Sequence, residues 1–126
     1  MLLIRTIVGP SQIHGVGVFA DEDVAEGRPI WRFAEGFDLV IPSDRIAALP
    51  DSFRHHLDTY AYRSADIPDA MVLSCDHARF LNHSDDPNTA LRPFETVARR
   101  AIRKGDEITC DYRAFVVDWD GFGPQP

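Results

Sequence analysis

The feature that most constrains this chain is the shortness of its apolar runs, which glycine, proline and aspartate separate along nearly the whole length. Residues 2–8 and 15–20 have the composition of short strands on either side of a Gly-Pro-Ser turn. Residues 29–41 indicate a pair of strands interrupted at Glu35 and Gly36. Strands are therefore expected to dominate the first third of the chain.

Helix-forming residues gather between positions 43 and 57. Ser43 or Asp44 would cap a helix there and Pro50 would break it, so one or two short helices are expected. Beyond that stretch, short apolar runs again alternate with turn residues. The sequence thus predicts a mostly β fold with short helices, within the α+β class.

Two segments share one spacing of an apolar residue, a turn glycine and the first apolar residue of a strand. Two copies indicate two similar turns and not a repeat architecture, which needs more copies. The matching residues are Val24, Gly27 and Ile30 in the first copy and Ile102, Gly105 and Ile108 in the second.

Length and charge limit the domain organisation and the kind of partner. A chain of 126 residues with 44% hydrophobic content can bury one core but not two. We expect one domain over residues 1–126, with its core at about 3–115 and a loose tail at 116–126. The formal charge of −7 argues against nucleic acid as the main partner and fits a basic peptide or protein.

The cysteines and the N-terminus bear on the compartment. Cys75 and Cys110 could form one disulfide or none, and in the absence of a CxxC pair the reduced state is expected. The apolar run near the N-terminus is too short for a signal peptide, and no run reaches the roughly 18 residues of a membrane helix. The sequence predicts a soluble protein of the cytoplasm or nucleus without a membrane partner, with specialised secretion left open.

Three clusters carry the candidate chemistry. In HGVGVFA, at residues 14–20, Gly15 and Gly17 would let backbone atoms approach a ligand closely, although a plain turn has the same composition. The stretch RFLNHSDDPN crowds Asn82 and His83 together directly after an apolar pair, and KGDEITCDY reads as a turn followed by a strand that ends in Tyr112.

Taken in order, these clusters resemble the SET-domain family of protein lysine methyltransferases. The likeness runs from the GxG motif through Asp69-Ala70 and ARFLNHSDDPN to GDEITCDY. It implies small curved sheets in a β-clip-like fold, few helices, and a knot-like threading of the C-terminal strand that brings the Asn-His-Ser segment against the Asp-Tyr segment. It also implies transfer of a methyl group from S-adenosylmethionine to a lysine of a basic protein, histone-like or other.

The resemblance assigns a cofactor-binding role to residues of all three clusters. Asn82 and the backbone of His83 offer donors and acceptors that suit the amino, carboxylate and adenine edges of S-adenosylmethionine. The alternative for this pair is a polar brace for the turn before Pro87. The expected cofactor contacts are His14, Gly15, Val16, Gly17, Arg79, Phe80, Asn82, His83 and Tyr112.

The implied reaction needs a dry channel that aligns a neutral amine, and no dedicated base is required. By resemblance Tyr112 is the catalytic residue, and Tyr60 and Tyr62 line the substrate channel, unless they are ordinary strand packing. Period-two alternation puts Cys110 on the same strand face as Tyr112. Cys110 then stands where the family usually has Phe or Tyr, which leaves room for added methyl groups unless the thiol turns into the core.

Departures from the family pattern are informative as well. Family members with a C-terminal zinc cluster carry a cysteine after Asn-His-Ser and three more in the tail, whereas here Asp85 and a cysteine-free tail take these places. We therefore expect no metal. Phe115, Trp119 and Phe122 would either cover the channel or simply pack on the sheet. A homodimer is left open.

Other functions have weaker support in the sequence. A non-catalytic module of the same fold, which binds a peptide or the cofactor, is the main alternative. Neither a thiol hydrolase nor a histidine metal site is selected by any spacing. Their candidate residues are Cys75 or Cys110 with His77 or His83 for the hydrolase, and His55, His56 and His77 for the metal site.

Overall fold

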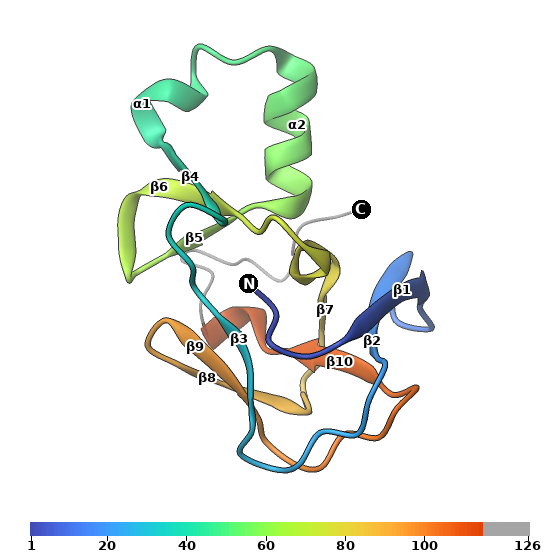
Figure 1. The fold of residues 1–126 in the computed structure, drawn as a ribbon. Coiled ribbons are helices and arrows are strands. Elements are labelled where there is room, and N and C mark those ends of the chain that lie inside the picture. Colours follow the sequence, from blue (N-terminus) through green and yellow to red (C-terminus); the bar gives the residue numbers. More distant parts are fainter. Residues whose placement is uncertain (115–126) are drawn as a thin grey trace.

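The computed structural model of the chain describes residues 1–114, which form three small sheets with few and short helices (Figure 1). The mostly β class predicted from the sequence is confirmed. No helix in these 114 residues has the length and apolar character needed to cross a membrane.

The first sheet joins the N-terminal hairpin to the last strand of the described chain. Its strands are β1 (Thr6–Pro10), β2 (Val16–Ala20), β7 (Asn82–His83) and β10 (Glu107–Cys110). β10 lies between β2, to which it is antiparallel, and β7, to which it is parallel (Figure 1). This pairing brings the Asn-His-Ser segment against the Asp-Tyr segment, as expected. The knot-like threading itself stays a prediction.

The other two sheets have three antiparallel strands each. One has the order β3 (Pro29–Arg32), β9 (Glu95–Ala98), β8 (Thr89–Arg92), and the other has the order β4 (Leu39–Pro42), β6 (Ile67–Leu73), β5 (Tyr62–Ser64).

Both strands expected within residues 29–41 form, but they do not pair with each other as predicted. β3 pairs with β9, and β4 pairs with β6. The buried Asp38 carboxylate accepts hydrogen bonds from the Ala34 N–H at 2.9 Å and from the N-terminal ammonium at 3.1 Å. These bonds stabilise a turn that leads the chain from one sheet to the next.

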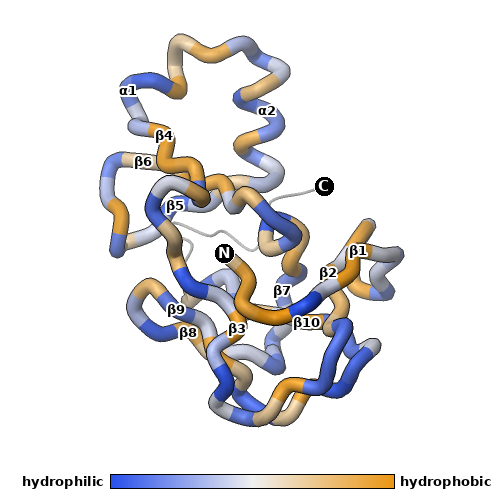
Figure 2. Tube along the Cα trace, in the orientation of Figure 1, coloured by the Kyte–Doolittle hydropathy of each residue, from blue (hydrophilic) through white to orange (hydrophobic). Residues whose placement is uncertain are grey.

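Two short α-helices lie on either side of the break at Pro50, as the sequence predicts: α1 (Ser43–Ile46) and α2 (Asp51–Tyr60). The predicted caps Ser43 and Asp44 are wrong, because the N-cap is Pro42, without a side-chain hydrogen bond. α1 begins directly where β4 ends, so Ser43 already lies within its first turn. Figure 2 shows hydrophilic and hydrophobic stretches alternating along α2, which buries Leu57. Two 3-10 helices complete the fold: η1 (His77–Phe80) and η2 (Tyr112–Ala114).

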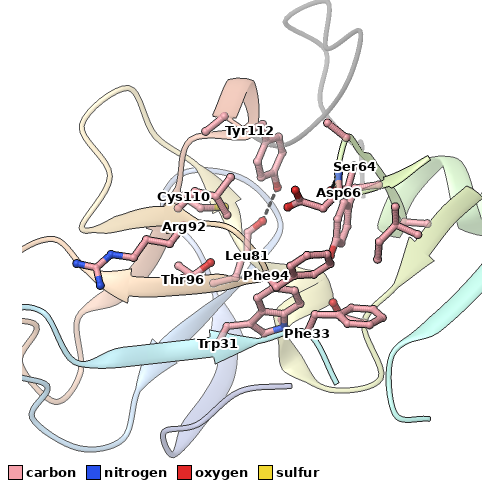
Figure 3. A pocket seen from close by; sticks show the side chains of 18 of the residues that line it. Trp31, Phe33, Ser64, Asp66, Leu81, Arg92, Phe94, Thr96, Cys110 and Tyr112 are labelled. Atoms are coloured by element: carbon pink, nitrogen blue, oxygen red, sulfur yellow. Dashed lines mark hydrogen bonds between the residues drawn. The ribbon is translucent and has the colours of Figure 1, made fainter. Parts of the chain in front are cut away.

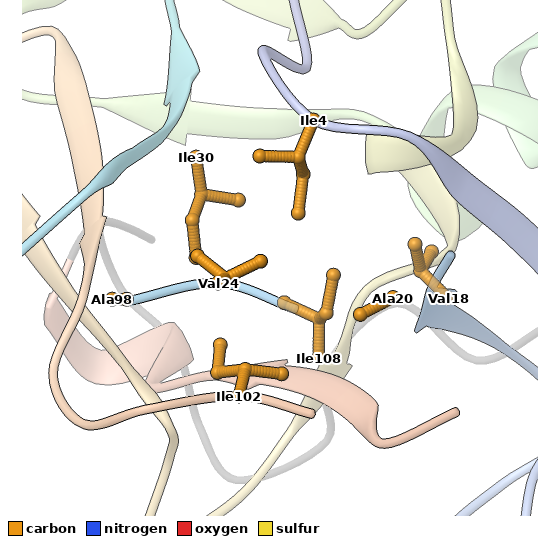
Figure 4. Close-up of a cluster of buried hydrophobic side chains, with 8 residues drawn as sticks. All are labelled: Ile4, Val18, Ala20, Val24, Ile30, Ala98, Ile102 and Ile108. Atoms are coloured by element: carbon orange, nitrogen blue, oxygen red, sulfur yellow. The ribbon is translucent and has the colours of Figure 1, made fainter. Parts of the chain in front are cut away.

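The main core is an aliphatic cluster that joins the first sheet to the two glycine turns (Figure 4). Val24 and Ile102 exchange backbone hydrogen bonds of 2.8 and 2.9 Å, so the turns with matching spacing lie side by side. Gly27 and Gly105 have φ values of +82° and +94°, which favour glycine. The cluster comprises Ile4, Val18, Ala20, Val24, Ile30, Ala98, Ile102 and Ile108, and a second cluster under α2 comprises Ile41, Leu57, Ala61, Met71 and Leu73.

Candidate functional site

A cavity of about 520 Å³ is lined by residues of all three sheets. Figure 3 shows Trp31, Phe33 and Phe94 gathered on one side of it, with the Phe33 and Phe94 rings 6.0 Å apart. Aromatic walls of this kind exclude water and suit the aliphatic stem of a long side chain. Its charged lining residues are Asp66, Arg79, Arg92 and Arg113, so the acidic excess of the chain is not concentrated here.

Tyr112 lies in the wall of this cavity, but not on the strand that the sequence predicted. β10 ends at Cys110, and the Asp111 carboxylate accepts a hydrogen bond of 3.0 Å from the Arg113 N–H, which turns the chain into η2. The Tyr112 hydroxyl donates to the Leu81 carbonyl (Figure 3). Burial raises the pKa of Tyr112, with Cys110 as the second cause. The phenol therefore stays protonated and acts as a hydrogen-bond donor, and it is not a base.

Cys110 also lines the cavity, although the alternation argument that predicted this position does not hold beyond the strand end. Its buried thiol lies 3.8 Å from the Asn82 carbonyl, to which it donates. Burial raises the pKa of Cys110 to about 12, and Asp111 adds to the shift. The thiol stays neutral, which argues against a nucleophilic role for Cys110. Neither Cys110 nor the exposed Cys75 forms a disulfide.

The two tyrosines predicted to line the substrate channel lie at the junction between α2 and β5. Tyr60 closes α2, Tyr62 opens β5, and both line the cavity. The Tyr60 ring packs edge to face on Phe80, with ring centroids 5.5 Å apart. Burial, followed by the charges of Asp38 and Asp66, raises the pKa of Tyr62. Both tyrosines thus present aromatic surface to the cavity, and the Tyr62 hydroxyl stays protonated.

A smaller hollow of about 20 Å³ shares part of its wall with the cavity and is also lined by Val16, the first residue of β2. The hollow brings together five predicted cofactor residues: Val16, Arg79, Phe80, Asn82 and Tyr112. Four residues line both the cavity and the hollow: Tyr60, Arg79, Leu81 and Tyr112. A ligand in the cavity and a ligand in the hollow would therefore both contact Tyr112.

The Asn82 side-chain amide is surrounded by more acceptors than it can satisfy. Its nitrogen lies 3.2 Å from the His14 carbonyl, 3.0 Å from the Val16 carbonyl, 2.9 Å from Glu107 Oε1 and 3.2 Å from Ser11 Oγ. The amide has only two hydrogens to donate. The GxG loop, Ser11 and Glu107 thus form a partly buried, acceptor-rich and negatively charged cluster, which suits a cation with several N–H groups.

Ser11 and Glu107 were not identified from the sequence, yet they belong to this cluster of acceptors. The Ser11 hydroxyl lies 2.8 and 2.9 Å from the two Glu107 carboxylate oxygens and accepts from the Ile13 N–H at 2.9 Å. A Cβ atom on Gly17 would lie 2.2 Å from Glu107 Oε1. Gly17 therefore leaves room for a carboxylate of the protein, whereas the sequence suggested room for a ligand.

The remaining predictions concern His83, the histidine metal site and the C-terminal aromatic residues. The His83 side chain lines neither the cavity nor the hollow, and its Nδ1 instead accepts from the Tyr112 backbone N–H. Among residues 1–114 no group of three or more His, Cys, Asp and Glu side chains could hold a metal, and His55, His56 and His77 form no such group. Phe115, Trp119 and Phe122 lie outside the described residues.

Comparisons with known proteins agree with this arrangement. The family described as SET domain matches residues 15–113. A Plasmodium falciparum protein named "Putative histone-lysine N-methyltransferase 1" is 29% identical in a match that covers 94% of this chain. The chain spans only 2% of the length of that relative.

Two solved structures share the fold at low identity. The Neurospora SET domain protein DIM-5, a histone lysine methyltransferase, is 21% identical with a TM-score of 0.60, over 88% of this chain and 53% of its own. Polycomb Repressive Complex 2 of Chaetomium thermophilum, autoinhibited and bound to S-adenosylmethionine, is 19% identical with a TM-score of 0.64, over 86% of this chain and 15% of its own.

Proposed function

Because the chain belongs to the SET-domain family, we propose that it is a methyltransferase that uses S-adenosylmethionine to methylate lysine side chains of a basic protein or peptide. The family relationship supports the reaction class. The names of the relative and of DIM-5, which refer to histone lysines, support a lysine-bearing substrate such as a histone. The protein that carries the lysine is a matter for experiment.

The observation that carries the proposal is the surplus of acceptors around Asn82. The α-ammonium group of S-adenosylmethionine has three N–H donors and a positive charge. The His14 and Val16 carbonyls supply acceptors for it, and the Glu107 carboxylate supplies the opposite charge. The residues present therefore fit this end of the cofactor. Gly15, the backbone of His83, Arg79 and Phe80 would complete the site.

The chain's own contribution to the reaction is alignment and exclusion of water. The bound cofactor supplies an electrophilic methyl group on sulfur. The large aromatic cavity would receive the lysine stem, and its low polarity favours the neutral amine over the ammonium. The lysine amine would enter in its neutral form, and the Tyr112 hydroxyl and ring would orient it toward the methyl group. Tyr60, Tyr62 and Cys110 would line this route.

Calorimetry with S-adenosylhomocysteine tests the cofactor part of this proposal. One binding site per chain is expected, and Asn82→Ala should weaken binding by about 1–3 kcal/mol, because it leaves partly buried partners unpaired. Ser52→Ala, an exposed position on α2, is the control and should bind as the wild type does. Absence of binding would refute the cofactor assignment. Equal affinity of Asn82→Ala and the wild type would refute only the role of Asn82.

A further inference from the structure

His83 lies at the point where the Asn-His-Ser segment meets the catalytic tyrosine. It is paired with Cys110 in the parallel register of β7 and β10, two residues before Tyr112. The His83 and Tyr112 rings are 5.5 Å apart, and the backbone N–H of Tyr112 donates a 3.1 Å hydrogen bond to His83 Nδ1. This bond connects the two segments just where the chain leaves β10 for η2.

The direction of this hydrogen bond determines the protonation of the ring. A backbone N–H can only donate, so His83 Nδ1 must carry a lone pair. In a neutral imidazole the proton then sits on Nε2, which lies 3.3 Å from Asp85 Oδ1 and can donate to it. A second proton could be added only at Nδ1, where it would face the Tyr112 N–H and replace an attraction by a repulsion between two donors.

The charged groups around the ring are already paired. Asp111 Oδ1 lies 3.7 Å from His83 Nδ1, and Asp85 faces Nε2. Arg113 contacts both carboxylates, Asp111 at 2.8 Å and Asp85 at 3.2 Å. The Arg113 hydrogen bond lowers the pKa of Asp111, which therefore stays ionised near neutral pH. The attraction of the two carboxylates for a proton on His83 is thus offset in part by the guanidinium.

We propose that His83 is a positioning residue that holds Tyr112 through its unprotonated Nδ1, and that protonation of the ring releases the Tyr112 backbone. The hydroxyl of Tyr112 would then no longer be fixed between the cavity and the hollow. Methyl transfer should therefore fall when acid protonates the ring. This consequence rests on the proposed function, whereas the hydrogen bond and its tautomer belong to the free protein.

Nitrogen NMR of the free protein with labelled histidine tests the proposal without any reaction. In the neutral ring, His83 should show a protonated Nε2 and an unprotonated Nδ1, and the Tyr112 amide signal should shift with the ring as acid is added. Loss of one signal in His83→Asn assigns it among the five histidines. A protonated Nδ1 in the neutral ring, or a Tyr112 amide that ignores the titration, would overturn the proposal.

The pH dependence of turnover gives an independent test. Asparagine places an acceptor close to the position of Nδ1 but does not titrate, so His83→Asn should keep most of the turnover and lose the acid limb. His83→Leu removes the acceptor and should lower turnover at every pH, by up to about a hundredfold if the tyrosine shifts by an ångström. His55→Asn, at an exposed position on α2, should keep the wild-type profile.

An asparagine variant as slow as the leucine variant, or one that keeps the acid limb, would contradict the proposal. If the wild type transfers no methyl group to any substrate, the proposed function fails, and the NMR titration still decides the role of His83.

Discussion

At the scale of single residues, the two glycines of the GxG motif meet different physical requirements. Gly15 has a φ of +46°, a left-handed conformation that glycine adopts at little cost. Gly17 is needed because Glu107, which approaches from β10, occupies the space of a side chain. A motif that suggests ligand approach in the sequence is therefore, at one of its two positions, an internal packing contact.

Replacing Gly17 with alanine should destabilise the fold by about 1–3 kcal/mol, the usual cost of overpacking. Much of that cost should disappear in a Glu107→Ala background, because the clash involves the carboxylate. Gly9→Ala is a matched control, since its Cβ would meet only Phe19 at 3.8 Å. Denaturant unfolding of the single and double variants measures the coupling. Strictly additive free energies would show that Glu107 does not fill the space.

The small side chain of Cys110 leads to a prediction about how many methyl groups the substrate lysine receives. Its thiol is small, buried and part of the cavity wall, so it leaves room for a second or third methyl group. Cys110→Tyr adds a ring and a hydroxyl, and should shift the products toward monomethyl-lysine. Cys110→Phe adds the ring alone and separates volume from hydrogen bonding. Mass spectrometry of a methylated peptide reads the result, and unchanged products in variants with intact folding would count against this position.

At the scale of elements, the Asn88 side chain forms hydrogen bonds with the backbone of β10 such as a neighbouring strand would form. Its side-chain oxygen accepts from the Thr109 N–H at 2.9 Å, and its side-chain nitrogen donates to the Glu107 carbonyl at 2.8 Å. The Asn88 N–H in turn donates to Thr109 Oγ1 at 3.2 Å. These bonds satisfy one edge of the strand that carries Glu107 and Cys110 and leads into Tyr112.

Asn88→Ala should lower the free energy of unfolding by about 1–3 kcal/mol, because two backbone groups of β10 lose their partners. Asn88→Asp keeps the side-chain acceptor but lacks the N–H donor, and should also be less stable than the wild type. Asp86→Ala, which removes only exposed ion pairs with Arg99 and Arg100, is the control and should cost less than about 1 kcal/mol. Wild-type stability of Asn88→Asp in denaturant unfolding would exclude the donor role.

The local sequence determines where several elements form, but it does not determine how all of the strands pair or where each strand ends. Local patterns predicted β2, the two helices around Pro50 and the two similar turns at Gly27 and Gly105, since each depends on neighbouring residues. The turn that sends β3 and β4 to different sheets involves the buried Asp38, which binds the nearby Ala34 N–H but also the N-terminal ammonium, far away in the sequence. The end of β10 before Tyr112 depends on the turn at Asp111, which a simple alternation pattern does not show.

At the scale of the whole molecule, the candidate site is a product of topology. The sequence identified residues that line the cavity and the hollow, because Asn82, the GxG loop and Tyr112 belong to local motifs. It could not identify Ser11 and Glu107 as a pair, because their contact depends on the register between β2 and β10. The aromatic wall likewise combines residues from separate elements, and no local pattern joins them.

The whole domain should fold and act without zinc. Asp85 stands where a zinc ligand occurs in some family members, and here it pairs with His83 and Arg113. Structural zinc needs about four nitrogen or sulfur ligands. Treatment with a chelator should therefore leave both the melting temperature and the activity unchanged, and stoichiometric zinc in elemental analysis of the purified protein would refute this.

The most direct test of the central claim is to map methyl groups by mass spectrometry after incubating the chain with S-adenosylmethionine and purified basic proteins. Because Lys104 is the only lysine of the chain, self-methylation adds little background. We predict cofactor-dependent methylation of substrate lysines, reduced by about one to three powers of ten in Tyr112→Phe, which corresponds to about 1.4–4 kcal/mol. Cofactor binding without methylation of any lysine would contradict the account and identify a non-catalytic binding module instead.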